Sequence, residues 1–390
     1  MTSYATDLSC PKCGRRYPRG KPWNLCECGG PLLVRYDLDA AARAVHREDI
    51  AARSPTMWRY RELLPVEDDA NVVTLGEGFT PLLAAERLGH RIGLPHLWVK
   101  DDGLNPTGTF KARGASCGVS MARELGIREV ALPTAGNAGG AWACYGAAAE
   151  IAVHVTMPTD APEVNQLECR MFGADLTLVD GLISDAAEVV ALGVGERGWF
   201  DVSTFKEPYR VEGKKTLGFE IAEQLGWRLP DAIVCPVGGG VGIIGIWLAL
   251  QQLLEIEWLE GAIPRLIAVQ AEGCAPIVRA FEEGAEETKP WPDARTLAAG
   301  LRVPQAFADF LILRAVRETG GTAVAVSDED IVTAIGELAR GAGIMAAPEG
   351  AATLAGAKRL VERRDVSTDE RIVLLNTGAA LKYPDVLAAG

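Results

Sequence analysis

Short apolar segments alternate with segments of helix length over most of the chain after residue 97. The apolar segments have the length of buried strands, and the intervening segments have the apolar spacing of helices. This alternation predicts an α/β fold whose strands are mostly parallel. The predicted strands are residues 97–100, 129–132, 153–157, 176–179, 232–235, 266–270 and 372–375. The predicted helices are residues 111–125, 138–149, 161–173, 183–197, 211–226 and 241–256.

The composition restricts the partners that this chain can have. It has 390 residues, of which 48% are hydrophobic and 23% are charged, enough for two or three globular domains. The formal net charge of -13 argues against nucleic-acid or acidic-membrane binding, because phosphate groups attract basic surfaces. No uncharged apolar run approaches about 18 residues, and the first residues lack the pattern of a signal peptide. We therefore expect a cytoplasmic protein without membrane spans that acts on small molecules.

Four of the nine cysteines lie close together near the N-terminus, as C-x2-C followed by C-x-C. Four thiolates at this spacing can hold a structural zinc ion in tetrahedral coordination, as in a zinc ribbon. The second pair is tighter than the usual C-x2-C, so a metal-free knuckle is the alternative. The candidate ligands are Cys10, Cys13, Cys26 and Cys28. The other five cysteines are scattered through apolar segments and are expected to be reduced core residues.

These patterns divide the chain into three regions. Residues 1–37 form the cysteine-rich module, which ends in a predicted strand over residues 31–36. Residues 38–80 form a linker that begins with a predicted helix over residues 38–53. Residues 81–390 form the α/β body, where we expect the chemistry to take place.

A single lysine, Lys111, stands at the start of a predicted helix, directly after a run of turn-forming residues. That run, residues 101–110, reads DDGLNPTGTF and follows the predicted strand at 97–100. A helix N-terminus and partial burial both disfavour the protonated form of an amine, so such a lysine can act as a nucleophile. From the residues alone, a solvated lysine on the first turn of a helix is the alternative.

A glycine-rich turn, PVGGGVG at residues 236–242, follows one predicted strand and opens the next predicted helix. Glycines let backbone N–H groups close around a phosphate, and the N-terminus of the helix attracts the anion. A glycine-rich turn by itself is weak evidence of a ligand. The candidate phosphate-binding residues are Gly238, Gly239, Gly240, Val241 and Gly242.

Two further polar motifs stand at predicted strand ends, where α/β folds place ligand groups. The sequence TAGNA at residues 134–138 follows one strand, and LLNTG at residues 374–378 ends another. The amide of Asn137 can hydrogen-bond a hydroxyl group, and Thr377 supplies a second polar side chain. An ordinary turn is the alternative at both places.

These four motifs, in this order, resemble those of the threonine synthase and threonine dehydratase superfamily of pyridoxal-phosphate (PLP) enzymes. NPTGTFKARG at residues 105–114 is similar to the N-P-T-G-S-F-K-D-R-G motif of threonine synthases, and its FKARGA ending is similar to that of threonine and serine dehydratases. The resemblance implies that Lys111 holds PLP as a Schiff base and that the glycine-rich turn binds the PLP phosphate. It also implies that Asn137 contacts the ring hydroxyl and Thr377 the ring nitrogen.

The same resemblance implies a fold and an assembly. The expected fold is the two-lobed α/β fold of the tryptophan synthase β-subunit type, with a small zinc-ribbon-like module before it. The smaller lobe is expected at about residues 112–205, inserted into the larger one. A homodimer is the expected oligomeric state.

The segment EPYRVEGKKT at residues 207–216 resembles the threonine synthase motif N-P-x-R-x-E-G-x-K-T, whose arginine binds the substrate phosphate. Arg210 is therefore expected to hold a phosphoryl group in a bidentate manner, as guanidinium groups can. A surface arginine on the first turn of a helix is the alternative. The candidate substrate-binding residues are Thr134, Ala135, Gly136, Ala138, Ser203, Thr204 and Arg210.

Several positions depart from the threonine synthase pattern. Ala112 replaces the Asp after the Schiff-base lysine, Ala138 replaces a Thr, and Gly239 and Gly242 stand in a turn that reads G-N-A-G-N in that family. APEGAA at residues 347–352 replaces E-P-A-S-A-A. Some donors to the substrate phosphate are therefore missing.

The resemblance nevertheless favours threonine synthase, a lyase that converts O-phospho-L-homoserine and water to L-threonine and phosphate. The reaction combines γ-elimination of phosphate with addition of water at the β carbon. The alternatives are a threonine or serine dehydratase, and a β-replacement enzyme similar to cysteate synthase.

Overall fold

The computed structural model describes residues 3–389, which divide into two compact units. The first unit consists of the chain up to Phe79, Lys111–Thr216 and Glu255–Trp258. The second unit consists of Thr80–Phe110, Leu217–Leu254 and the chain from Leu259 onward. The chain therefore passes from one unit to the other several times, and Lys111 is the first residue after one such passage.

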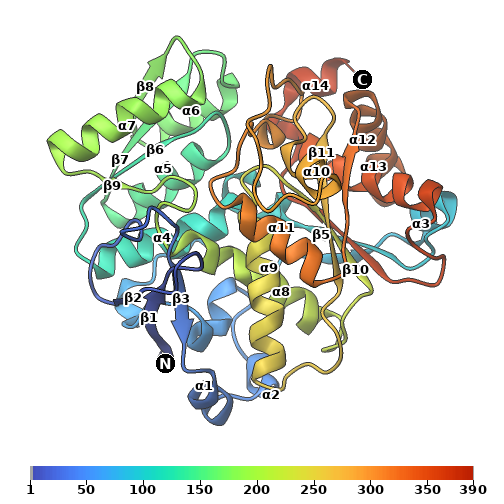
Figure 1. Ribbon diagram of the computed structural model, residues 1–390, viewed down its shortest axis with the longest axis horizontal. Helices are drawn as coiled ribbons and strands as arrows, with labels where there is room; N and C mark the ends of the chain where they lie inside the picture. The colour runs from blue at the N-terminus through green and yellow to red at the C-terminus, as the bar shows by residue number, and fades with distance from the viewer. Residues whose placement is uncertain (1–2, 390) are drawn as a thin grey trace. The chain divides into compact units, whose positions relative to one another are not determined.

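The first unit contains a four-stranded parallel sheet with the order β8-β7-β6-β9 (Figure 1). Its core is formed by apolar residues of the strands and by Trp142, which is almost fully buried. Its strands are β6 (Glu129–Pro133), β7 (Ala152–Pro158), β8 (Asp175–Val179) and β9 (Phe200–Asp201). The helices of this part are α4 (Lys111–Glu124), α5 (Ala138–Ala149), α6 (Glu163–Met171), α7 (Ile183–Arg197) and the start of α8 (Arg210–Gln224).

The cysteine-rich module belongs to the first unit and forms an antiparallel sheet of β1 (Ala5–Ser9), β2 (Arg16–Pro18) and β3 (Leu33–Tyr36). The predicted strand at 31–36 is confirmed as β3. Its core is continuous with side chains of α4, including Cys117 and Met121.

The predicted single helix over residues 38–53 is wrong. Two short helices, α1 (Leu38–Ala44) and α2 (Arg47–Ile50), stand in its place, because Val45 adopts an extended conformation. Each helix has its own N-terminal cap: the Asp37 carboxylate accepts from the Ala40 N–H, and the Asp49 carboxylate accepts from the His46 N–H. The Asp49 cap starts a second helix after the extended residue Val45, which the apolar spacing does not show.

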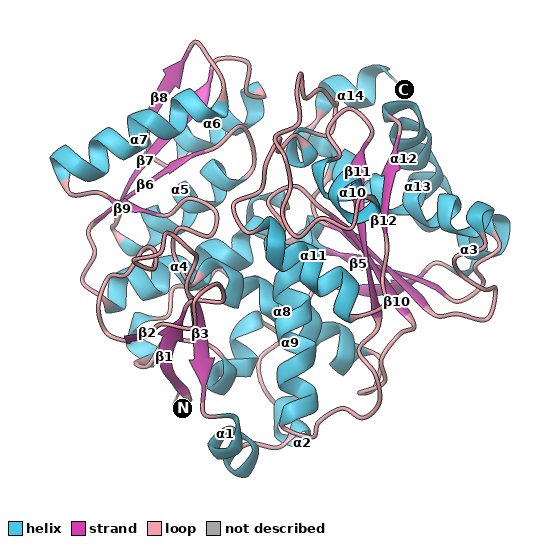
Figure 2. Ribbon diagram, viewed as in Figure 1, coloured by secondary structure: helices cyan, strands magenta, loops and turns pink. Residues whose placement is uncertain are grey.

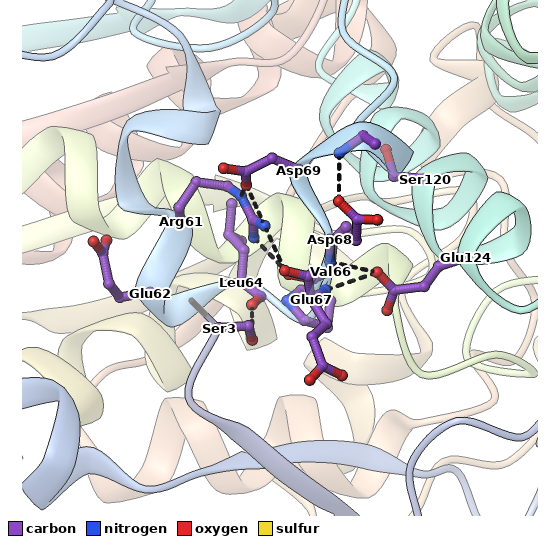
Figure 3. Close-up of polar contacts among 12 residues, drawn as sticks. Ser3, Arg61, Glu62, Leu64, Val66, Glu67, Asp68, Asp69, Ser120 and Glu124 are labelled. Carbon is purple, nitrogen blue, oxygen red and sulfur yellow. Dashed lines mark hydrogen bonds and ion pairs between the residues drawn. The ribbon is translucent and has the colours of Figure 1, made fainter. Parts of the chain in front are cut away.

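Two 3-10 helices, η1 (Met57–Leu63) and η2 (Asp69–Asn71), flank a loop that fixes the far end of α4. The Glu124 carboxylate accepts hydrogen bonds from the N–H groups of Glu67 at 2.8 Å and Asp68 at 3.0 Å (Figure 3). Arg61 donates to the Val66 carbonyl oxygen at 2.6 Å within the same loop. The helix that begins at Lys111 is thereby held at its last residue.

The second unit contains a six-stranded sheet with the order β12-β11-β10-β13-β5-β4, in which only β4, at one edge, is antiparallel. Figure 2 labels four of its strands, β5, β10, β11 and β12. Its strands are β4 (Leu82–Ala84), β5 (Leu97–Asp101), β10 (Ala232–Pro236), β11 (Arg265–Ala271), β12 (Ala323–Val326) and β13 (Ile372–Asn376). Its helices are α3 (Glu86–Ile92), α9 (Val241–Glu255), α10 (Pro276–Glu282), α11 (Asp309–Glu318), α12 (Asp328–Ala342), α13 (Pro348–Arg363) and α14 (Pro384–Ala389). Its short 3-10 turns are η3 (Asp102–Leu104), η4 (Pro106–Gly108), η5 (Ala299–Leu301) and η6 (Ala380–Lys382).

The predicted α/β fold with mostly parallel strands is confirmed. Every strand and helix predicted between residues 97 and 375 corresponds to an observed element whose ends differ by two residues or fewer. Within residues 3–389, no helix is both long enough and apolar enough to cross a membrane.

Candidate active site

In the second unit, Phe110 joins two of the predicted ligand-binding segments. Its N–H donates to the Thr377 carbonyl oxygen at 2.9 Å. On its other side, a Cβ atom at Gly242 would lie 3.1 Å from the Phe110 ring, so the turn and the ring pack closely. The glycine-rich turn and the end of β13 therefore meet at the residue that immediately precedes Lys111.

The glycine-rich turn at residues 236–242 is packed too tightly for larger residues. A Cβ atom at Gly238 would lie 2.1 Å from the Gly300 carbonyl oxygen, and one at Gly240 would lie 2.2 Å from Ile312. Gly240 also has a φ of +78°, which favours glycine. The turn leads into the 15-residue helix α9, whose first N–H groups and dipole attract an anion. A phosphate group fits this arrangement.

The end of β13 is held by the residue before Thr377. The Asn376 amide donates to the Asp101 carboxylate at 2.7 Å, at the end of the neighbouring strand β5. Burial raises the pKa of Asp101, and the hydrogen bond from Asn376 opposes that shift. Thr377 itself is buried, with 8% of its surface exposed, at the carboxyl end of a parallel strand. This is the position where α/β folds place ligand groups.

The departure at residues 347–352 has a structural role. A Cβ atom at Gly350 would lie 2.1 Å from the Asn376 amide oxygen, so a glycine is needed there. Glu349 is buried and accepts hydrogen bonds from the Tyr383 hydroxyl at 2.6 Å and the Gly300 N–H at 2.7 Å. Gly300 is the residue whose carbonyl closes against Gly238. The altered motif therefore connects the glycine-rich turn to the C-terminal segment.

In the first unit, Lys111 is the first residue of α4, as predicted. The loop of residues 134–138 closes on itself, because the Thr134 hydroxyl accepts from the Gly136 N–H at 3.1 Å. Asn137 stands at the N-terminal cap position of α5. Against this loop lies Asn165, a buried residue whose amide nitrogen would be 3.7 Å from a Cβ at Gly136.

Arg210 is buried and is not a surface arginine. One guanidinium nitrogen donates to the Thr204 hydroxyl at 3.2 Å, and another donates to the Val202 carbonyl. A Cβ atom at Gly114 would lie 2.8 Å from Arg210 Cγ, so the arginine packs directly on α4. Gly114 follows Lys111 by three residues, which places the two positions on neighbouring turns of one helix face. The predicted phosphate-binding arginine and the predicted PLP lysine therefore share one surface of the first unit.

The charge of Arg210 is partly balanced by Glu207. The Glu207 carboxylate lies 3.4 Å from Arg210 Nε and also accepts from the N–H groups of Tyr209 and Arg210 at the start of α8. Burial lowers the pKa of Arg210, whereas the negative charges of Glu207 and Asp201 raise it. Burial likewise raises the pKa of Glu207, and Arg210 opposes that shift. Since an arginine stays protonated in proteins, the site keeps a buried cation.

Ser203 and Thr204 lie in a turn just before Arg210. The Ser203 N–H donates to the Asp201 carboxylate at 2.9 Å, and its hydroxyl donates to the same oxygen. Thr204 presents its hydroxyl to Arg210. The structure thus places Thr204 against Arg210, with Ser203 next to Thr204 in the chain. Their role in substrate binding stays a prediction.

The four N-terminal cysteines gather in one place. Their sulfur atoms all lie within 4.8 Å of one another, and the pairs Cys10–Cys28 and Cys13–Cys26 are 3.5 Å apart. In a tetrahedral zinc site with bonds of about 2.3 Å, the sulfur atoms would be roughly 3.8 Å apart. The predicted clustering is confirmed, and the cluster fits a zinc ion.

One of these thiols is already favoured as a thiolate, the form that binds metals. Burial raises the pKa of Cys26, but hydrogen bonds from the Tyr17 hydroxyl and the Cys28 N–H outweigh it and lower the pKa to about 6.

Three residues that the motifs do not mark as functional contact the predicted site or a residue packed against it. They are Glu207 beside Arg210, Trp142 with its ring centroid 5.3 Å from the Arg210 guanidinium, and Glu349 beside Gly300. Glu207 carries a sequence signal, because an acidic residue just before a helix is a typical N-terminal cap. Trp142 and Glu349 carry none, since their contacts come from distant parts of the chain.

Comparisons with known proteins agree with this picture. Residues 73–378 match the family described as "Pyridoxal-phosphate dependent enzyme". Threonine synthase of Methanocaldococcus jannaschii is 37% identical over 96% of this chain and 93% of that protein. Threonine synthase of Methanosarcina acetivorans is 38% identical over 97% of this chain and 93% of that protein. Among solved structures, the processed form of threonine deaminase isoform 2 from Solanum lycopersicum is 25% identical, with a TM-score of 0.68 over 85% of this chain and 92% of that one.

Proposed function

We infer the activity from one premise: the chain belongs to the family of pyridoxal-phosphate-dependent enzymes. We propose that it is a threonine synthase, a lyase that converts O-phospho-L-homoserine and water to L-threonine and phosphate. Relatives of that name align with nearly the whole chain, at 96% and 97% coverage. The observation that carries the proposal is Arg210, a buried cation that packs on α4 near Lys111.

We assign the cofactor contacts by the chemistry of the residues present. Lys111 would hold PLP covalently through Nζ, and the turn from Gly238 to Gly242 would bind its phosphate. Asn137 would contact the ring hydroxyl, and the Thr377 hydroxyl would face the ring nitrogen. Bound PLP supplies an electron sink that stabilises negative charge at the substrate carbons. Thr377 is neutral, so it would leave the ring nitrogen largely unprotonated, which favours elimination and replacement over transamination.

Lys111 also moves protons in this proposal. With PLP and substrate bound, the Nζ of Lys111 would be the base that accepts the proton of the substrate Cα. The same amine can then return protons as phosphate leaves the γ carbon and water adds at the β carbon. One base at the start of α4 thus serves several proton transfers.

Arg210, Ser203 and Thr204 would hold the substrate phosphate. A guanidinium group binds a phosphate in a bidentate manner, and burial strengthens the attraction. The same contacts stabilise the negative charge that collects on the departing phosphate. Ala138, Gly239 and Gly242 offer no side-chain donors, so Arg210 would carry most of the phosphate affinity.

The second candidate function is a threonine or serine dehydratase. FKARGA at residues 110–115 and the triple glycine of the phosphate turn favour it, and so does the similarity to a threonine deaminase structure. A β-replacement enzyme similar to cysteate synthase is a third candidate. For all three we propose a homodimer with a structural zinc ion in the cysteine module.

The test compares two reactions of the purified PLP-bound protein. Phosphate release and threonine formation from O-phospho-L-homoserine are measured beside keto-acid formation from L-threonine and L-serine. We expect phosphate release, and a loss of about 100-fold in kcat/KM in Arg210→Ala, because a charged hydrogen-bonding partner of the phosphate is removed. Arg228→Ala, which removes an exposed arginine, is the matched control. Keto acid without phosphate release would show that the protein is a dehydratase.

A further inference from the structure

One side chain of the cysteine module, Asn24, hydrogen-bonds the segment that carries the proposed phosphate-binding hydroxyls. Its amide nitrogen donates two hydrogen bonds of 2.7 Å, one to the Asp201 carbonyl oxygen and one to the Lys206 carbonyl oxygen. These two carbonyls stand on either side of Ser203 and Thr204. A single side chain therefore joins both ends of the turn, across more than 170 residues of sequence.

The turn from Asp201 to Lys206 requires contacts from outside because its backbone is strained. Phe205 has a φ of +60°, in the left-handed region that non-glycine residues rarely adopt. Within the turn, the Lys206 N–H donates to the Ser203 carbonyl oxygen at 3.0 Å. Strained conformations persist only where surrounding contacts determine them. The two bonds from Asn24 are such contacts.

Asn24 is itself held firmly. It lies two residues before Cys26, whose buried side chain belongs to the same apolar cluster as Cys117 of α4 and Tyr209. Tyr209 directly precedes Arg210. A second polar contact joins the same regions, because the Tyr36 hydroxyl of β3 donates to the Glu212 carboxylate at 2.6 Å. The cysteine module thus contacts the segment from Asp201 to Glu212 at several points.

We propose that Asn24 is a positioning residue for the phosphate subsite: it holds Ser203 and Thr204 in place for the substrate phosphate. The proposal rests on the function proposed above. It gives the cysteine module a role in substrate binding, because folding around the four cysteines fixes the position of Asn24. Asn24 itself contacts neither substrate nor cofactor.

The variants are Asn24→Ala, which removes both hydrogen bonds, and Asn24→Asp, which places carboxylate oxygens against two carbonyl oxygens. Arg16→Ala is the matched control: Arg16 is an exposed residue of the same module that pairs with Asp7 and does not contact residues 201–212. Zinc and PLP content are measured for each protein. Variants that keep both at the wild-type level report on positioning alone.

Kinetics separate positioning from general damage. In Asn24→Ala we expect KM for O-phospho-L-homoserine and the inhibition constant of inorganic phosphate to rise about 10-fold, with kcat changed less than about 3-fold. In Asn24→Asp the rise should be larger. The affinity for L-threonine, which has no phosphate, should stay unchanged when followed by the absorbance of bound PLP. Wild-type values of KM in both variants, or equal losses for threonine and phosphate, would overturn the proposal.

Hydrogen exchange provides a test that does not depend on turnover. Amides of residues 202–206 should exchange at least about 10-fold faster in Asn24→Ala than in the wild type or in Arg16→Ala. If the wild type releases no phosphate from O-phospho-L-homoserine, the proposed function fails. Faster exchange together with weaker binding of inorganic phosphate would then still support a positioning role. Unchanged exchange would refute it, whatever the activity.

Discussion

Glycines at points of close approach decide which side chains can reach the proposed site. Gly114 is the clearest example, because it lets Arg210 pack directly on α4. Gly350 does the same for Asn376, and Gly238 for the Gly300 carbonyl. At these positions the lack of a Cβ atom allows the neighbouring group to approach closely, so the glycine is needed for the geometry of the site. A substitution by alanine there tests geometry without changing any charge.

We predict that Gly114→Ala displaces Arg210 and lowers kcat/KM for O-phospho-L-homoserine by about 10-fold, mainly through KM. The added Cβ would lie 2.8 Å from Arg210 Cγ and 3.1 Å from its carbonyl oxygen, so the arginine must move. Gly195→Ala in α7 is the matched control, since a Cβ there meets nothing within 4 Å. Both changes raise helix propensity equally. Unchanged kinetics in Gly114→Ala would mean that the position of Arg210 does not limit substrate binding.

At the scale of elements, a buried ion pair joins β5 to α8. Lys100 on β5 donates to the Glu220 carboxylate on α8 at 2.6 Å, and both side chains are fully buried. Lys100 also donates to the Thr80 carbonyl oxygen and to Gln224. β5 leads into the segment that ends at Lys111, and α8 begins at Arg210. The pair therefore connects the strand that precedes the Lys111 segment to the helix that begins at Arg210.

We predict that Lys100→Met lowers the free energy of unfolding by about 3–5 kcal/mol, because it leaves Glu220 charged and buried without its cation. The double variant Lys100→Met/Glu220→Met should recover most of that loss, since two apolar side chains of similar volume can replace a buried ion pair. Urea unfolding of the PLP-bound proteins provides the comparison. If the double variant is as unstable as the single one, the attraction between Lys100 and Glu220 exceeds the cost of burying the two charges, and the pair itself stabilises the fold.

At the scale of the whole chain, the cysteine module and α4 share one apolar cluster. Cys10 and Cys26 belong to it together with Met57, Cys117 and Met121. Loss of the module's fold would therefore expose apolar surface of α4, the helix that begins at Lys111. Metal binding by the four cysteines is therefore expected to affect α4 and, through it, the proposed site at Lys111.

We predict one zinc ion per chain, and a thermal unfolding midpoint that falls by at least about 5 °C when a chelator removes it, because structural zinc contributes several kcal/mol or more to folding. Cys26→Ser should reproduce the effect, whereas Cys144→Ser, a half-buried cysteine of α5, should not. Metal analysis and calorimetry measure both quantities. A zinc-free protein that is insensitive to the chelator would establish the metal-free knuckle.

Much of the fold could be predicted from sequence because its signals are local. Buried parallel strands such as β10 and β13 are continuous apolar runs, and the helices between them have regular apolar spacing, so their ends differ from prediction by two residues or fewer. The break at Val45 escaped prediction because Val45 is extended and the Asp49 carboxylate caps a second helix, within an otherwise helical pattern. Local propensity alone does not show which polar residues will cap.

The sequence by itself determined the order of strands and helices, the cysteine cluster and the four motifs that point to PLP. Each of these depends on neighbouring residues or on short spacings. Only the tertiary structure decided that Gly114 admits Arg210, that Glu349 joins Gly300 to Tyr383, and that Asn24 bridges Asp201 and Lys206. These contacts join residues about 30 to 180 positions apart. They exist because close packing brings distant segments together, which no local pattern encodes.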